Sequence, residues 1–512
     1  MFKSTYIKAY CLLLAVVSFA TSCTKSLDEP NKEVAGEVLH WQSISDTKSG
    51  LMGIYGLMRS AMVSNNGHWI YGDVRGGDFS IYGRGDLSAV KENNLNASFP
   101  LIEKLSNWQR FYAVINSASV FIEKAPKVLA SDTRYTEANL KQDIAQARAL
   151  RAFAYFYMVR IWGDVPLLTK SFDNGSFEEV AKEDEEVVLN YAAKELKECI
   201  EDLPYRYGVY PSYYYGESAS SWEKILFNKI SAYAILAHIS AWQGKYIDVD
   251  AYTKFILDNY GYANIQRLSE ITASGSGTRG LTGNYGIFSN NYAYGQMVNF
   301  SASYAYGEAT NSGHIEQLTL AQPVVNKEFP DIYVDKKLVS TLFYDKYDKR
   351  FGIDTISGLY KTPYFLNYTN EIPIFNKIRI IRDGVTDGNY AVFGSNLVFT
   401  RLEEINLLRA EALAVLGNRI DAIEQLNIVK ALRGVSSYSV ISTSPILDEI
   451  FEERRRELIG EGWRYYDIVR YNKIKQSDPN FNNLISQKGI YWPIATDILG
   501  RNSKLVQNTY WK

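Results

Sequence analysis

The stretch ARALRAFAYFYMVRIWGDVPLL, residues 147–168, decides most of the fold. Its large apolar side chains recur at the spacing of one helix face: Leu150, Phe153, Tyr157 and Ile161. Other apolar residues between them make the segment apolar nearly all round, which indicates a helix buried in a core. Gly163 is a suitable C-terminal cap, and Pro166 prevents the helix from continuing. We therefore expect a buried helix that ends at Trp162.

The sequence on both sides of this segment also has helical periodicity. We expect helices within residues 43–62 and 101–126, and a strongly amphipathic helix over residues 444–474, followed by an extended tail. Residues 232–257 and 407–434 share an outline in which closely spaced alanines precede a glycine and a second apolar segment. This outline resembles the helical hairpin of tetratricopeptide repeats, in which small residues let two helices approach closely. Because the match is degenerate, we expect irregular packing and not a regular array.

Residues 260–394 differ from the rest of the chain. They are rich in Gly, Ser, Asn, Tyr and Thr, with only short runs that favour strands. A long irregular insertion in a helical protein is usually functional or disordered, and the many aromatic rings argue against disorder. We therefore expect a mainly α protein with minor β structure and a loop-rich face.

The composition and charge of the chain argue against binding of nucleic acid. The chain has 512 residues, 22% of them charged, and a formal net charge of -2. No long run of Lys or Arg is present, so we expect no binding of nucleic acid. The 39 tyrosines are the unusual feature, because they exceed the phenylalanines and tryptophans together.

The N-terminus is typical of a secreted lipoprotein. Lys3 and Lys8 precede an apolar segment that is too short to span a bilayer, and small residues then lead to Cys23. We predict a signal peptide over residues 1–22, lipidation of Cys23, and a tether over residues 23–35. An ordinary signal peptide cut nearby, or a buried apolar N-terminus, is the alternative. In the lipidated form only Cys199 would remain as a free thiol, so no intrachain disulfide is expected.

Charged and metal-binding patterns favour structural roles. The segment ERRRELIGEGWRYYDIVR, residues 453–470, is interpreted as helix whose charges form ion pairs locally and clamp neighbouring loops. The four histidines lack the spacing of metal ligands, so we expect no metal. Calcium bound with the help of Asp73, Asp78 and Asp86 is the less favoured alternative. No motif of nucleophilic catalysis is present, so we expect no catalytic residue and no cofactor.

Tyrosines within Ser-, Gly- and Asn-rich segments suit carbohydrate binding. A tyrosine ring offers an apolar face for the C–H face of a sugar, and Asp, Asn or Arg nearby can bind the hydroxyls. For any single ring, packing of a loop onto the helical scaffold is the favoured alternative. The candidate ligand-binding residues are Trp69, Tyr71, Asp73, Arg75, Asp78, Tyr82, Arg84, Tyr285, Tyr292, Tyr294, Tyr304 and Tyr306.

Several segments together resemble the SusD/RagB family of outer-membrane nutrient-binding lipoproteins of Bacteroidetes. These are residues 147–168, the preceding NWQRFYAVINSA, FTRLEEINLLRAEALAVLG, EERRRELIGEGWRYYDIVRYN, and the closing YWPIATDILGRNSKLVQNTYW. They occur in family order over nearly the whole mature chain. One departure is Asn502-Ser503, where the family usually has Asn-Pro. The resemblance divides the mature chain into a SusD-like helical region, residues 36–260, and a loop-rich insertion with the C-terminal SusD/RagB region, residues 261–512, forming one compact unit.

The resemblance implies a scaffold of tetratricopeptide-like hairpins that carries a loop-rich ligand surface. It also implies a lipid-anchored, surface-exposed protein of the outer membrane, which captures a glycan and delivers it to a SusC-like TonB-dependent transporter. Members bind and do not cleave. The family supplies no binding residues for this sequence, because its members differ in their loops. The alternatives are capture of peptides, as in RagB-like systems, a glycoside hydrolase, and a structural subunit of the transporter without a ligand.

Overall fold

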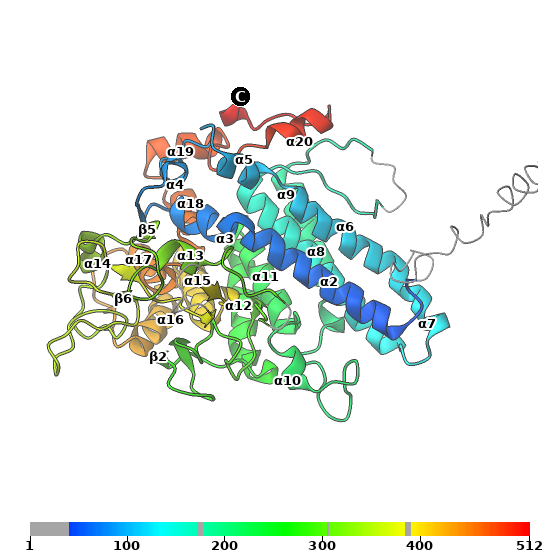
Figure 1. Ribbon diagram of the computed structural model, residues 1–512, viewed down its shortest axis with the longest axis horizontal. Coiled ribbons are helices and arrows are strands. Elements are labelled where there is room, and N and C mark those ends of the chain that lie inside the picture. Colours follow the sequence, from blue (N-terminus) through cyan, green and yellow to red (C-terminus); the bar gives the residue numbers. More distant parts are fainter. Residues whose placement is uncertain (1–39, 173–177, 305–306, 384–390) are drawn as a thin grey trace, which may run out of the picture.

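The computed structural model describes residues 40–172, 178–304, 307–383 and 391–512. The described chain is mostly helical, and its strands form five separate two-stranded sheets (Figure 1). The expected mainly α class with minor β structure is confirmed. Within these residues, no helix combines the length and the apolar character needed to cross a membrane.

The helix expected from residues 147–168 is the C-terminal part of α8, Glu137–Trp162. Its N-terminus is a capping box, in which the Thr136 hydroxyl accepts from the Asn139 N–H and the Asn139 side chain accepts from the Thr136 N–H. From residue 149 to Trp162 every residue is buried. Helix α6 (Gln109–Lys124), which precedes α8 in the sequence, and helix α9 (Glu185–Cys199), which follows it, both pack along α8. These contacts explain why the surface of α8 is apolar nearly all round.

Helix α2 and the short turns η4 and η5 also pack against α8, and the other N-terminal helices and turns complete this part of the chain. Their bounds are α2 (Ile44–Val63), η2 (Ser64–Asn66), α3 (Gly67–Trp69), the π-helical turn η3 (Ile70–Val74), α4 (Gly85–Lys91), α5 (Pro100–Ser106), α6 (Gln109–Lys124), η4 (Ala125–Lys127), α7 (Val128–Ser131), α9 (Glu185–Cys199), η5 (Ile200–Asp202) and α10 (Ala219–Trp222). Cys199, at the end of α9, is a buried free cysteine.

Two helical hairpins follow, as the alanine and glycine pattern predicts. The first consists of α11 (Lys229–Trp242) and α12 (Tyr246–Asn259), and the second of α15 (Leu402–Val415) and α16 (Arg419–Leu432). Helix α12 packs against α15, so the two hairpins lie side by side. Ala237, Ala241 and Ala412 lie in the small core between them, where short side chains let the backbones approach.

Between the hairpins the chain forms short strands and loops. The remaining elements here are η6 (Tyr260–Ala263), β2 (Glu270–Thr272), β3 (Gly280–Thr282), β4 (Val298–Phe300), α13 (Ile315–Thr319), β5 (Ile332–Tyr333), α14 (Lys336–Leu342), β6 (Phe365–Leu366), β7 (Ile374–Phe375), β8 (Ile381–Asp383), β9 (Val392–Phe393) and β10 (Leu397–Thr400). Strand β1 (Ser80–Ile81) pairs with β5, and β4 pairs with β10; both pairs are antiparallel. The sheets β2–β3, β6–β7 and β8–β9 complete the set.

The C-terminal part departs from the expected single helix over residues 444–474. The chain instead forms α17 (Ile446–Leu458) and α18 (Arg464–Lys475). The helix breaks because Gly460 and Gly462 both have φ +79, a left-handed conformation that glycine adopts readily. The tail is also not fully extended, because it contains α19 (Pro479–Ser486), α20 (Thr496–Arg501) and η7 (Thr509–Trp511).

One hydrophobic core extends from Trp41 to Trp511 and includes residues from both sides of the expected boundary at residue 260. Phe153 of α8 stacks on Phe300 of β4, with ring centroids 5.8 Å apart. The same ring meets Phe399 of β10 edge-on at 5.0 Å. The loop-rich part therefore packs directly on the helical part. The division of the mature chain at residue 260 stays a prediction.

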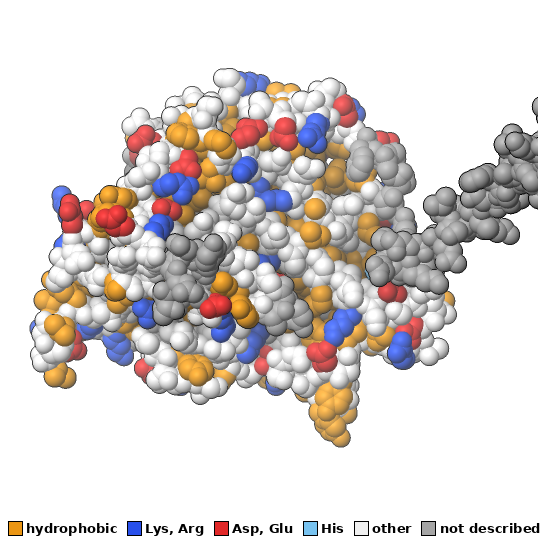
Figure 2. Space-filling view, viewed as in Figure 1, with side chains coloured by type: hydrophobic (Ala, Val, Ile, Leu, Met, Phe, Trp, Pro, Cys, Tyr) orange, Lys and Arg blue, Asp and Glu red, His pale blue; other side chains and the backbone are white. Residues whose placement is uncertain are grey.

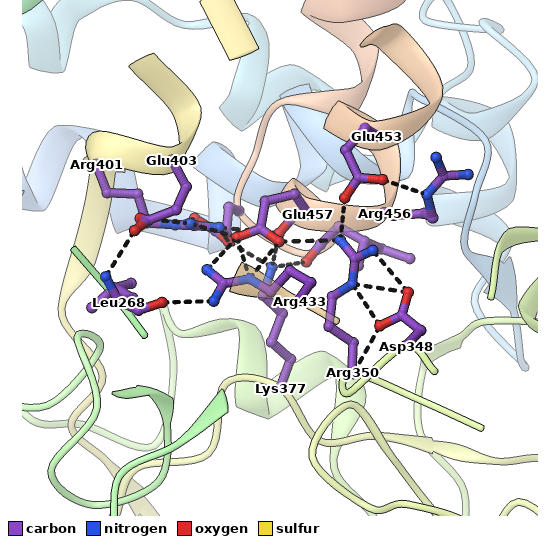
Figure 3. A network of polar contacts seen from close by, with 12 residues as sticks. Leu268, Asp348, Arg350, Lys377, Arg401, Glu403, Arg433, Glu453, Arg456 and Glu457 are labelled. Atoms are coloured by element: carbon purple, nitrogen blue, oxygen red, sulfur yellow. Dashed lines mark hydrogen bonds and ion pairs between the residues drawn. The ribbon is translucent and has the colours of Figure 1, made fainter. Parts of the chain in front are cut away.

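A buried network of charges joins α15, α16 and α17 to the loops that precede them (Figure 3). Glu457 on α17 accepts hydrogen bonds from Arg401 (2.7 Å), Arg433 (2.8 Å) and Arg350 (3.1 Å). Burial alone would raise the pKa of Glu457, but the three guanidinium charges outweigh burial and hold that pKa well below its usual range.

The same network includes a second carboxylate. Glu461 accepts from Lys377 at 2.5 Å and from Arg401 at 2.8 Å. Arg455, also on α17, pairs with Asp78 at 2.6 Å, more than 370 positions away in the sequence. The interpretation of residues 453–470 as a structural clamp is thus confirmed.

Candidate functional site

A cavity of about 700 Å³ lies between α2 and two loop segments. One wall is a stripe of α2, the second is the segment around α10, and the third is formed by residues 290–303 together with Glu308. The lining residues are Lys48, Met52, Tyr55, Gly56, Arg59, Glu217, Ser220, Ser221, Trp222, Lys224, Ile225, Asn290, Asn299, Phe300, Ser301, Ser303 and Glu308. Around α2 and α10, basic and acidic side chains are interspersed on the face seen in Figure 2, without an extended patch of one sign.

Helix α2 presents one stripe of residues, which includes two basic side chains, to the cavity because its opposite face is held in the core. Lys48, Met52, Gly56 and Arg59 are three or four residues apart and lie on one side of the helix. Apolar residues on the other side are buried: Leu51, Ile54, Met58, Ala61 and Met62. Gly56 leaves space in this wall, since no atom lies within 4 Å of where a Cβ would be.

The wall opposite α2 is a set of hydrogen bonds around Lys224. The Asn299 side-chain amide donates to the Lys224 carbonyl at 2.9 Å, and the Ser301 hydroxyl donates to the same oxygen at 2.8 Å. The Lys224 ammonium donates to the Asn290 carbonyl at 3.0 Å. Asn299 is buried, and among the described residues its Oδ1 atom has no hydrogen-bond partner. That oxygen is itself buried, so it is not an accessible acceptor for a ligand.

Some charged side chains of the cavity form ion pairs within the described chain, and others do not. Lys48 forms an ion pair with Glu217, and its ammonium lies 5.2 Å from the centre of the Trp222 ring. Among the described residues, Arg59 donates to the Glu308 carbonyl alone, at 2.7 Å. Within the described part of the chain, neither Arg59 nor Lys224 has a carboxylate oxygen within ion-pair distance. Burial lowers the pKa of both basic groups, and the neighbouring Glu308 and Glu223 charges oppose that effect.

A buried carboxylate anchors the wall formed by the α10 segment. Asp143 on α8 accepts hydrogen bonds from the hydroxyls of Tyr135 (2.7 Å), Tyr215 (2.6 Å) and Tyr214. Burial raises the pKa of Asp143 to about 6, against the effect of these hydrogen bonds. Because Tyr214 and Tyr215 immediately precede the cavity segment, Asp143 fixes the position of Glu217. The loop before α10 projects at the bottom of Figures 1 and 2. Tyr210 and Tyr213, which precede α10 in the sequence, are exposed.

The first group of predicted ligand-binding residues is buried. The exposed fraction is 6% or less for each of them: Trp69, Tyr71, Asp73, Arg75 and Asp78. Their polar atoms bind other parts of the same chain. Tyr71 donates to the Leu105 carbonyl, Arg75 donates to the Ile490 carbonyl, and Asp73 accepts from the Gly462 N–H. The expectation that these five side chains face a ligand is therefore wrong.

Close packing against the C-terminal region explains this error. A Cβ at Gly72 would lie 2.0 Å from the Gly462 carbonyl oxygen, so only glycine fits at this contact. Gly76 is in similarly close contact with the Arg464 side chain. Gly72 and Gly76 thus serve close packing against the C-terminal region and not a surface loop.

Tyr82 and Arg84 lie on a different surface from the cavity. Tyr82 is 43% exposed and packs on Phe329 with ring centroids 4.6 Å apart. Arg84 pairs with Asp86 (2.7 Å) and Asp331 (3.2 Å). Both residues adjoin the β1–β5 pair, which Figure 1 shows well separated from α10. Their role in binding stays a prediction.

The tyrosines of the loop-rich segment divide into three groups. Tyr292 is 1% exposed, and so the expectation that it faces a ligand is wrong. Tyr294 is half-buried and donates to the Gly277 carbonyl at 2.7 Å. Tyr285 and Tyr304 are exposed, by 37% and 57%, and Tyr304 directly follows the cavity residue Ser303. Tyr306 and Cys23 lie outside the described residues.

No cluster suited to a metal ion occurs in the described residues. The three carboxylates considered for calcium have separate partners: Asp73 accepts from the Gly462 N–H, Asp78 pairs with Arg455, and Asp86 pairs with Arg84. The alternative of a calcium site built from these residues is therefore not supported.

The sequence prediction missed the charged cavity residues Lys48, Arg59, Glu217 and Lys224. They come from a helix and from a segment some 170 positions away, which the sequence alone does not bring together. One signal was present: Gly53 and Gly56 fall in the middle of α2, where bare backbone on one helix face indicates space or a close contact.

Comparison with known proteins identifies relatives over the whole chain. A family model described as the SusD family matches residues 367–483. A crystal structure of a SusD superfamily protein from Bacteroides thetaiotaomicron is 48% identical, covers 92% of this chain and 100% of its own, and has a TM-score of 0.84.

Two further relatives are more distant. The SusD-like protein P38 of Formosa agariphila is 26% identical over 97% of both chains. A structure named as a laminarin binding SusD-like protein is 20% identical, covers 91% of this chain and 99% of its own, and has a TM-score of 0.66. This last likeness concerns the fold alone.

Proposed function

The chain belongs to the SusD family, and on that premise we propose that it is a cell-surface binding protein that holds a glycan in the cavity beside α2. The observation that carries this proposal is the cavity itself. It has about 700 Å³ of space, a size that suits a small ligand, and its lining combines aromatic rings with fixed polar groups.

The cavity has the chemistry that a sugar requires. Apolar surface for C–H faces comes from the half-buried Met52 and Ile225 and from the small exposed parts of the largely buried rings that line the cavity, Tyr55, Trp222 and Phe300. The exposed Ser220 and Ser221 offer both donors and acceptors for hydroxyls. The exposed ring of Tyr304 lies beside the lining and provides a platform for a further sugar unit.

Capture at the membrane follows from the same proposal. Lipid on Cys23 would anchor the protein to the outer membrane, with the first residues of the mature chain as a tether. The bound glycan would then pass to a SusC-like TonB-dependent transporter. The protein would act by binding and not by catalysis.

The test is a binding screen with the chain from residue 24, which contains every described residue. Oligosaccharides of plant, microbial and host type are titrated by calorimetry, and a reducing-end assay is run on each. We expect binding of at least one glycan class, with Kd roughly in the micromolar to millimolar range, and no cleavage. Cleavage of a bound glycan would contradict the proposal.

A matched pair of variants locates the site. Gly56→Trp places a large side chain in the cavity without a clash at Cβ, whereas Gly53→Trp places the same side chain on α2 outside the lining. We expect Gly56→Trp to abolish binding and Gly53→Trp to leave it unchanged. Equal binding by both variants would move the site elsewhere, for example to the Tyr82–Phe329 surface.

A further inference from the structure

Two basic side chains beside the cavity have no carboxylate at ion-pair distance among the described residues, and this bears on the class of glycan that binds. Of the five charged residues in the lining, Lys48 and Glu217 pair with one another. Glu308 accepts from the Ser303 N–H at 2.9 Å through Oε2. This leaves Arg59 and Lys224 without an ion pair among the described residues. We propose that the cavity binds an acidic glycan, whose carboxylate or sulfate groups contact Arg59 and Lys224.

Arg59 is suited to an acidic group. It lies on the cavity side of α2 and uses one nitrogen, Nη2, to donate to the Glu308 carbonyl. A guanidinium carries five N–H donors in a planar fork, so its remaining donors match the two oxygens of a carboxylate or sulfate. An acceptor with a full negative charge would form the shorter and stronger type of hydrogen bond.

Lys224 faces the cavity from the opposite wall. Its ammonium donates to the Asn290 carbonyl, which leaves two of its three N–H donors without a protein acceptor in the described structure. The lysine backbone is fixed by Asn299 and Ser301, which both donate to its carbonyl oxygen. The Asn290 carbonyl thus holds the ammonium, and the bonds from Asn299 and Ser301 hold the backbone from which the side chain extends.

Partial burial makes these two charges costly when they are unpaired. Burial lowers the pKa of Arg59 and of Lys224, which shows that the surrounding protein disfavours the charged form. In the network around Glu457, by contrast, more deeply buried guanidinium groups are paired with carboxylates. A ligand anion would supply the partner that the protein lacks here.

The neighbouring groups accommodate the rest of a sugar. The exposed Ser220 and Ser221 can donate to and accept from hydroxyls, and the Trp222 ring, 5.2 Å from the Lys48 ammonium, is among the lining residues. A neutral glycan would satisfy the serines but not the two cations. This inference rests on the proposed glycan-binding function, and it adds the charge of the ligand.

The experiment compares oligosaccharides that differ only in charge. A uronate-containing oligosaccharide is titrated alongside its carboxyl-reduced form, and a sulfated one alongside its desulfated form. We expect the acidic member of at least one pair to bind about tenfold more tightly or better. Its affinity should fall between about 0.05 and 0.5 M salt, where screening becomes short-ranged, while the neutral member responds little.

Variants assign this discrimination to the two residues. Arg59→Gln and Lys224→Gln should each reduce the preference for the acidic member and its salt dependence, with binding of the neutral member retained. Arg59→Lys should restore part of the preference, because it restores the charge without the fork. Lys141→Gln removes an exposed charge on α8 outside the lining and serves as the matched control.

The outcomes separate this inference from the proposed function. Equal binding of acidic and neutral members, or a preference unchanged in both Gln variants, would overturn the acidic-glycan inference and leave glycan binding in place. No binding of any oligosaccharide by a folded protein would contradict the proposed function, and the inference with it. Binding of an acidic peptide, with no binding of any glycan, would also overturn both the proposed function and the inference.

Discussion

Two groups of basic side chains in this protein lie in very different surroundings. Arg350, Arg401 and Arg433 are almost completely buried, and each pairs with Glu457 (Figure 3). Arg59 and Lys224 are half-buried beside a cavity and pair with no carboxylate in the described structure. Both groups contain basic residues held by neighbouring elements, and they differ in whether the chain supplies the counter-charge.

The difference separates structural charges from charges available to a ligand. In the buried network every cation is neutralised from within, so the network joins helices to loops but has nothing left to bind. At the cavity the chain holds the Arg59 and Lys224 side chains in place, but some of their N–H donors have no acceptor among the described residues. Charge content alone does not distinguish the two regions, because residues 453–470 are the more conspicuously charged in the sequence.

The largest effect is expected from breaking the buried network. Glu457→Gln removes the charge shared by three guanidinium groups and leaves Arg433 with no carboxylate partner. Breaking a buried ion pair from one side costs about 3–5 kcal/mol, so we expect a loss of this size in the free energy of unfolding. Denaturant unfolding followed by circular dichroism measures it.

The control for this change is Glu424→Gln on the exposed side of α16. We expect a change within about 0.5 kcal/mol there, as for most surface substitutions. If Glu457→Gln were as mild as Glu424→Gln, the network would not be a structural clamp.

A comparison of two aromatic residues sharpens the distinction between packing and binding. Trp69 is buried, so Trp69→Ala should cost about 3–5 kcal/mol of stability through the cavity that it leaves. Tyr304 is exposed beside the lining, so Tyr304→Ala should leave stability nearly unchanged. We expect it to weaken glycan binding by about 0.5–1.5 kcal/mol, roughly two- to tenfold.

Unfolding experiments and calorimetric titrations on both variants give the two quantities separately. The account would fail if Trp69→Ala preserved stability and selectively lost the ligand, since that would make Trp69 a surface contact.

A pH effect is expected at the carboxylate that anchors the cavity wall. The pKa of Asp143 is raised by burial from its ordinary 3.8 to about 6. Between these values the folded protein holds a proton that the unfolded chain has lost, so this group makes stability fall as pH rises through the window. The change is at most about 1.4 kcal/mol per pH unit.

Asp143→Asn removes this titration. We expect the wild-type protein to lose stability relative to the variant between about pH 4 and pH 6 and to show a constant difference above that window. Parallel unfolding curves at pH 4, 5, 6 and 7 test this, and a difference that does not vary with pH would contradict the assignment.

The smallest effect on stability is expected at the cavity cations. Lys224→Gln removes a half-buried charge that has no carboxylate partner, so we expect a change within about 0.5 kcal/mol of unfolding free energy. Thermal unfolding checks it. A loss as large as that of Glu457→Gln would mean that Lys224 is structural, and the contrast between the two regions would disappear.

The sequence predicted those parts of the fold in which one segment carries the whole pattern. Helix α8 was evident because its apolar residues, cap and following proline lie within thirty positions. The two hairpins were evident for the same reason. The split between α17 and α18 was missed, although Gly460 and Gly462 mark it, because the apolar spacing continues across the break.

The site was harder to predict because its parts are distant in the sequence. Residues 69–78 have the glycines, rings and charges of a binding loop, but those features serve contacts with Gly462 and Ile490, about 400 positions away. The loop-rich segment, residues 260–394, was singled out in the sequence as unusual, and residues 290–303 and Glu308 within it do contribute a wall of the cavity. The lining residues there are Asn, Ser, Phe and Glu, and the local pattern does not reveal which side chains face inward.

The most direct test of the account is a crystal structure of the protein with a bound acidic oligosaccharide. We predict that the sugar occupies the cavity beside α2, with an acidic group within 4 Å of the Arg59 guanidinium or the Lys224 ammonium. A sugar bound with both of these groups free, or bound on the Tyr82–Phe329 surface with the cavity empty, would contradict the account.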